Sequence, residues 1–137
     1  MKKILFIILG FILLSISTVA QVPINRTITL QWTASGDDGN IGTASMYDIR
    51  YSSDSLLLTG SVLTIGWVNA IQAIGEPIPK ISGSAESYTL TIPLTDGIKY
   101  YFAIKVADEV GNWSTMSNIV IRLFIDSSPP AAIIDLH

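Results

Sequence analysis

Residues Thr27-Ile28-Thr29-Leu30-Gln31-Trp32-Thr33 carry polar side chains at the odd positions and apolar side chains at the even positions. In an extended chain, successive side chains point to opposite faces. Ile28, Leu30 and Trp32 therefore share one face, and the polar residues share the other. A period of two predicts a β-strand that is buried on one side and solvated on the other.

The same alternation returns further along the chain. The predicted inward sets are Tyr47, Ile49 and Tyr51; Tyr88, Leu90 and Ile92; and Tyr100, Phe102, Ile104 and Val106. A last strand is predicted within 117–125, and a short edge strand is expected after 67–71. The connecting stretches 35–40, 96–97 and 108–112 are rich in Gly, Asp and Asn, which favour turns. Short strands without a helical period predict an all-β antiparallel sandwich.

The N-terminus has the three parts of a secretory signal. Lys2 and Lys3 are followed by the apolar run 4–14 and by a small, weakly polar stretch that ends in Thr18-Val19-Ala20. This order predicts a signal peptide over 1–20 and a domain over 21–126. The alternative is an uncleaved anchor, because no charge occurs from residue 4 to residue 25. Both interpretations place the domain outside the cytoplasm, secreted or at the cell surface.

The inventory of functional groups argues against catalysis. The 137 residues carry a net charge of −3, no cysteine, and a single histidine at position 137. Nucleophilic triads and His or Cys metal sites lack their residues. A mildly acidic chain without basic clusters also argues against nucleic-acid binding. We therefore expect a protein that is not an enzyme, with no cofactor and no catalytic, cofactor-binding or metal residues.

Four segments in order resemble the fibronectin type III family, in particular its secreted bacterial members. They are Leu30-x-Trp32-Thr33, Tyr47-x-Ile49-Arg50-Tyr51, the run from Leu94 through Gly97 and Tyr100 to Ile104, and Ala107 to Ser114. The resemblance implies an immunoglobulin-like sandwich with Trp32 at the centre of its core. It also implies that the Tyr100 hydroxyl bonds to backbone upstream, with Leu94 packed beneath the ring.

The chain departs from the family pattern at both ends. Family members begin with a strand ahead of the Leu-x-Trp strand, and residues 21–26 are too few for a strand and a turn. The first strand is therefore predicted to be missing or truncated. Residues 127–137 resemble a linker and the first strand of a following repeat. One interpretation is a longer multidomain protein; the other is head-to-tail self-association, in which residues 131–137 of a neighbouring copy fill the vacant place.

Three groups of surface residues are candidates for binding. The loops 35–42 and 108–112 are expected at one pole, and their oxygen-bearing residues either bind calcium or only form turns: Asp37, Asp38, Asn40, Asp108, Glu109 and Asn112. Trp67 and Trp113 either contact a ligand or cover the sandwich. Arg50 and Lys105 are expected to face outward on adjacent strands, as a binding face or as solvated charges. Asn25-Arg26-Thr27 and Asn112-Trp113-Ser114 match the glycosylation triplet.

The expected function is a non-catalytic extracellular module for adhesion, protein binding or spacing within a longer secreted or cell-surface protein. Its partners would be other proteins or surface polymers, with no membrane contact after signal cleavage. Two alternatives stay open at this point: an accessory module of a secreted hydrolase, and a self-assembling donor-strand subunit.

Overall fold

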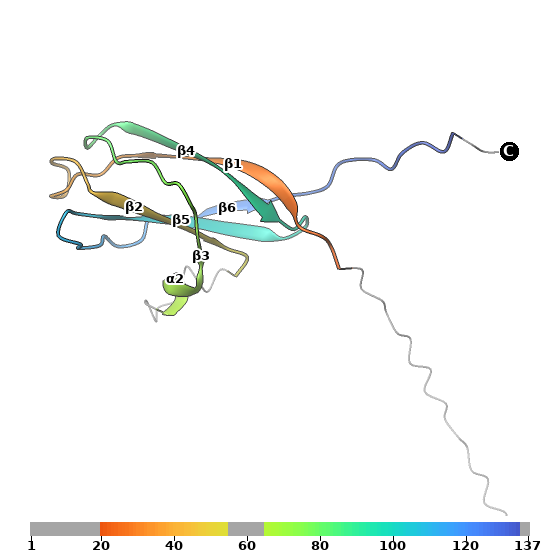
Figure 1. Cartoon of the computed structure of the whole chain (residues 1–137), viewed down its shortest axis with the longest axis horizontal. Coiled ribbons are helices and arrows are strands. Elements are labelled where there is room, and N and C mark those ends of the chain that lie inside the picture. Colours follow the sequence, from red (N-terminus) through yellow and green to blue (C-terminus); the bar gives the residue numbers. More distant parts are fainter. Residues whose placement is uncertain (1–19, 55–64, 135–137) are drawn as a thin grey trace, which may run out of the picture.

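The computed structural model describes residues 20–54 and 65–134. These residues form two antiparallel sheets that face each other (Figure 1). The first sheet pairs β1 (Ile24–Thr33) with β4 (Ala85–Leu94). The second has the order β3 (Ile71–Gln72), β2 (Met46–Ser52), β5 (Lys99–Ala107) and β6 (Val120–Leu123). A short helix, α2 (Ile65–Asn69), precedes β3. The predicted all-β sandwich is confirmed.

The two long strands β1 and β4 pair along their whole length, from Ile24 opposite Leu94 to Thr33 opposite Ala85. Ile28 is buried and the threonines beside it are exposed, so the predicted alternation is confirmed. On the solvated face, the hydroxyl of Thr29 lies 2.9 Å from that of Thr89. Such cross-strand pairs stabilise the register of a two-stranded sheet.

The centre of the core is formed by Phe102, Ile49 and Leu94, which are the largest fully buried side chains. The expectation that Trp32 fills this place is wrong. Trp32 is half-buried and packs its ring edge-on against Tyr47, with ring centroids 5.1 Å apart. The reason is its position on β1, whose only strand neighbour among the described residues is β4, so the far side of the indole is left uncovered.

The turn from β4 to β5 ties three parts of the chain together. The backbone N–H of Thr95 donates to the Tyr100 hydroxyl at 3.0 Å, and Leu94 beneath it is fully buried. The contact expected from the resemblance is therefore present. Arg26 Nη2 lies 2.7 Å from both carboxylate oxygens of Asp96, which fastens the start of β1 to this turn.

Two expected boundaries change. The first long strand, β1, begins at Ile24, three residues earlier than expected. It therefore includes residues 24–26, half of the segment 21–26 that precedes the expected start. Residues 65–69 form the helix α2 instead of an extended lead into the edge strand. Residues 1–19, which make up nearly all of the predicted signal peptide, and residues 55–64 and 135–137 lie outside the described part. None of the helices in residues 20–54 and 65–134 is long and apolar enough to cross a bilayer.

Candidate functional site

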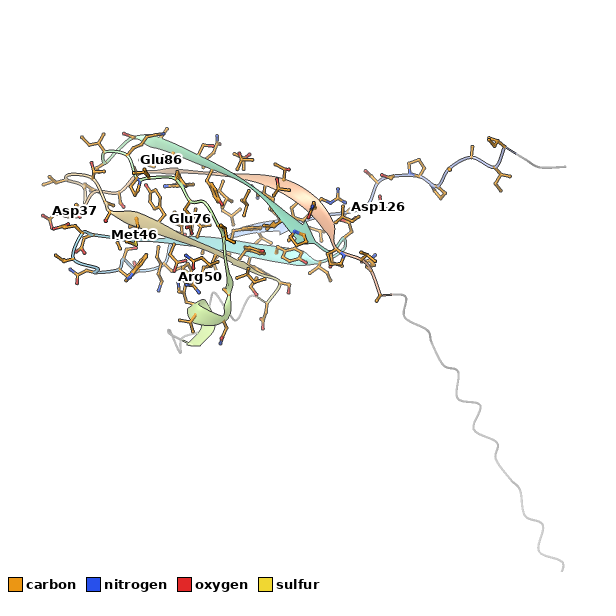
Figure 2. The ribbon with its side chains drawn as sticks, in the orientation of Figure 1. Asp37, Met46, Arg50, Glu76, Glu86 and Asp126 are labelled. Carbon is orange, nitrogen blue, oxygen red and sulfur yellow. The ribbon has the colours of Figure 1, made fainter. Side chains whose placement is uncertain are left out.

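Loops 35–45 and 108–113 meet at one pole, which we call the loop pole; Asp37 marks it in Figure 2, at the opposite end from Asp126. The N–H of Ser45 donates to the carbonyl of Ala107 at 2.8 Å and holds the loops together at their base. Gly36 allows the first loop to fold tightly, because a Cβ there would lie 2.2 Å from the carbonyl oxygen of Ile41. Only glycine fits so close a backbone approach.

The second loop is built around the carboxylate of Asp108. Its Oδ1 accepts the backbone N–H groups of Val110 at 3.1 Å and Asn112 at 2.7 Å, and its Oδ2 accepts the Asn112 side-chain amide at 2.7 Å. Burial acts to raise the pKa of Asp108, but the hydrogen bonds from Asn112 and neighbouring backbone outweigh it and lower the pKa below its ordinary value. Asp108 and Asn112 thus form the turn, as one of the two interpretations predicted.

The carboxylates of the two loops approach each other. A hydrogen bond with Glu109 raises the pKa of Asp37 above its ordinary value, and burial and the neighbouring negative charges raise it further. Of the six oxygen-bearing residues, Asp37 and Glu109 therefore lie close together across the two loops. Within residues 20–54 and 65–134, no three Asp, Glu, His or Cys side chains are grouped so that they could hold a metal ion. The acidic residues give the loop pole a negative field.

The same two loops expose large apolar side chains. Ile41 is 75% exposed, Val110 74% and Trp113 46%. The backbone of Trp113 forms a bridge with Ala107, which fixes the indole beside the second loop. Exposed large apolar side chains within a polar surround are a feature of protein-binding surfaces. The loop pole therefore combines contact area with charge.

Trp67 behaves differently from Trp113 because it is buried against the outer face of the four-stranded sheet. Its Nε1–H donates to Asp48 Oδ2 at 3.0 Å. Arg50 and Lys105 lie over the ring, with Cζ 5.6 Å and Nζ 4.8 Å from the ring centroid. Such cation–π contacts hold an aromatic ring in place. Trp67 thus covers the outer face of the four-stranded sheet, and Arg50 and Lys105, the two cations predicted to face outward, hold its ring in place.

Arg50 connects this cluster to α2, which covers the same side of the sheet (Figure 2). Its Nε lies 2.9 and 3.0 Å from the two oxygens of Asp48. Its Nη1 donates to the carbonyls of Trp67 and Val68 at 3.1 and 3.3 Å. Arg50 therefore satisfies the C-terminal carbonyls of a very short helix. We call Asp48, Arg50, Trp67 and Lys105 the Trp67 cluster; its role is to fasten α2.

A cavity of about 280 Å³ lies between the two sheets, bordered by β1 and β6. We call it the β1 groove. Its apolar lining comes from both sheets: Leu30 and Trp32 on β1, Phe102 and Ile104 on β5, and Val120 on β6. Polar side chains also border it, namely Gln31, Ser117, Asn118 and Arg122. The sequence analysis predicted a missing or truncated first strand, and among the described residues no strand pairs with β1 on the side away from β4.

Known proteins resemble this chain over most of its length. Its sequence is similar to calcium-activated chloride channel regulator 1. The Sus scrofa protein is 34% identical over 112 residues, which cover 79% of this chain, and the Homo sapiens protein is 34% identical over 115 residues, which cover 81%. The matched region is 12% of the length of each relative. No protein-family model matches the sequence, and no solved structure matches it.

Sequence reasoning missed the role of Asp48. A usable signal was present, because Asp48 and Arg50 are two residues apart on a strand and must share a face. Glu86 carried the same kind of signal, because it lies two residues before Tyr88 on β4 and therefore on the buried face, but its partner was not predictable. Its Oε1 accepts the backbone N–H of Lys80 at 2.7 Å, a contact set by the path of a loop and not by strand periodicity.

Proposed function

We propose that this chain is a non-catalytic extracellular module of the fibronectin type III kind, which binds or spaces proteins within a longer secreted or cell-surface protein. The observation that carries the proposal is the extent of the match. About four-fifths of this chain aligns with only 12% of each relative. A sandwich of this size therefore corresponds to one domain-sized segment of a much longer protein.

The loop pole is the surface that favours protein binding within this proposal. Ile41, Val110 and Trp113 supply apolar contact area, and the carboxylates around them select a partner of complementary, basic character. The relatives are named as regulators of a channel, which is compatible with a domain that acts through contacts. Adhesion and binding use the same surface, whereas a spacer would use only the rigidity of the sandwich.

Export is the first part of the proposal to test. The full chain, carrying a C-terminal tag, is expressed in a host with a secretory pathway, and the protein is recovered from outside the cytoplasm. We expect the N-terminal sequence of the exported protein to begin at Gln21. Retention of the intact chain in the cytoplasm would contradict an extracellular module.

A second experiment separates binding from spacing. The exported chain is immobilised and exposed to the secreted and surface proteins of its source organism, alongside a triple variant with Ile41, Val110 and Trp113 changed to Ser. Thr29→Ser, on the outer face of β1, is the matched control. Binding through the loop pole predicts retention by the native chain and the control but not by the triple variant. Equal retention by all three would exclude this pole.

A further inference from the structure

One long edge of the sandwich carries unpaired backbone groups. The N–H of Ala34, just after β1, donates to Ser84 across the sheet at 2.9 Å. Backbone groups alternate in direction along a strand, so Thr33, Gln31 and Thr29 point their N–H and C=O groups away from β4. No described strand pairs with β1 on that side. A ten-residue edge of this kind is a template for a further strand.

The β1 groove lies directly along this edge. Leu30 and Trp32 border it from one sheet, and Val120 borders it from the other. An added strand would therefore meet backbone partners on β1 and apolar partners beneath it at the same time. Main-chain hydrogen bonds and side-chain pockets together are the two components of strand addition.

We propose that residues 131–136 of a second copy of this chain occupy the β1 groove as a strand antiparallel to β1. In an extended segment, Ala132, Ile134 and Leu136 share one face, and that face carries no charge. The opposite face includes Asp135 and must point to solvent. Ile134 is 93% exposed and is not part of the hydrophobic core of the described residues. The extended chain over 126–134 runs away from the body (Figure 1).

The direction of entry disfavours the segment of the same molecule, because its linker would have to extend almost fully along β1 and then reverse. The carbonyl of Phe124 accepts the N–H of Gly97 at 2.7 Å, so the tail leaves beside the turn to which the start of β1 is tied. An antiparallel strand must instead enter at the Thr33 end. β1 is about 34 Å long at ~3.4 Å per residue. Ala131 follows Phe124 by seven residues, a reach of at most about 25 Å.

A second copy meets no such restriction, because its tail can enter from beyond the Thr33 end. Each molecule then donates a strand at one pole and accepts a strand along its β1 edge. The donating and accepting surfaces are different, so the contact is heterologous and does not close on a pair of molecules. The structure thus points to head-to-tail chains whose length depends on protein concentration.

The test uses sedimentation velocity of the full chain after export, over a range of concentrations. We expect the native chain to form oligomers that grow with concentration. Ile134→Asp places a charge on the buried face of the donor and is expected to weaken association at least about tenfold. Ile133→Asp, one residue away on the solvated face, is the matched control and should stay within about twofold. A native chain that is monomeric throughout, or two variants that weaken association equally, would overturn the proposal.

A peptide experiment tests the acceptor side without depending on assembly. The Ile134→Asp chain, which keeps an empty groove, is titrated with a synthetic peptide of residues 129–136 and followed by tryptophan fluorescence, because Trp32 borders the groove. We expect a saturable change that a peptide carrying the same Ile134→Asp substitution does not produce. Absence of binding by the native peptide would show that the β1 groove does not accept this segment, and the proposal would fail.

Discussion

Asp48→Ala is the most informative single substitution in the Trp67 cluster, because one carboxylate serves two donors. Asp48 is 7% exposed and lies on β2, beneath α2. It accepts from Arg50 Nε at 2.9 and 3.0 Å and from Trp67 Nε1 at 3.0 Å. Its removal leaves both donors without their acceptor in a place that little water reaches.

The expected cost follows from these contacts. Loss of the charged hydrogen bond to Arg50 costs about 1.5–3 kcal/mol, and an unpaired buried N–H on Trp67 costs about 1–3 kcal/mol. Arg50 keeps its backbone carbonyl partners, which places its share at the lower end. We expect Asp48→Ala to lower the free energy of unfolding by about 3–4 kcal/mol, a large part of the roughly 5–15 kcal/mol of an ordinary domain.

Urea unfolding followed by far-ultraviolet circular dichroism measures this change. Trp67→Phe is the companion variant; it removes the indole N–H that donates to Asp48 together with part of the buried ring, and is expected to cost about 1–3 kcal/mol. The loss of unfolding free energy in the double variant should be smaller than the sum of the losses in the two single variants, because both substitutions remove the same hydrogen bond. An Asp48→Ala protein within about 0.5 kcal/mol of the native chain would refute the role that we assign to the Trp67 cluster.

Three further predictions concern other parts of the molecule. Tyr100→Phe removes the acceptor of the Thr95 N–H and should cost about 1–2 kcal/mol in the same urea experiment. Trp32→Ala should cost about 2–3 kcal/mol by thermal or urea unfolding, below the ~3–5 kcal/mol of a fully enclosed aromatic residue, because Trp32 is half-buried. The raised pKa of Asp37 means that the folded state binds the Asp37 proton more tightly than the unfolded state does. The protonated Asp37 therefore contributes its full stabilisation below pH 3.8, the ordinary pKa, and this stabilisation is lost as the pH rises through the raised pKa. Glu109→Gln should therefore raise the urea midpoint at pH 7 relative to the native chain, and the difference should shrink on acidification or with added salt.

Much of the fold could be predicted from the local alternation of polar and apolar residues. The inward face of β1 and the inward residues of β2, β4 and β5 follow from a period of two, which is a property of any extended chain. The contact between Tyr100 and Thr95 was also accessible, because it joins residues five positions apart within one turn.

The candidate site was less accessible from sequence. α2 is only five residues long and has no helical periodicity to reveal it, and its position depends on Asp48 and Arg50, which are distant in sequence. The convergence of Asp37 with Glu109 could be predicted only by assuming the topology. The position of Trp32 was misjudged for the same reason, since its burial depends on which strand lies beyond β1.

The sequence alone therefore determined which residues form strands and which side of each strand is apolar, because these depend on neighbours within a few positions. Only the tertiary structure showed that Trp67 is covered while Trp113 is exposed, that α2 is fastened by a carboxylate on β2, and that an apolar groove borders β1. The physical reason is that coverage of a side chain or a sheet edge depends on segments tens of residues away, and strand periodicity carries no information about which segment arrives there.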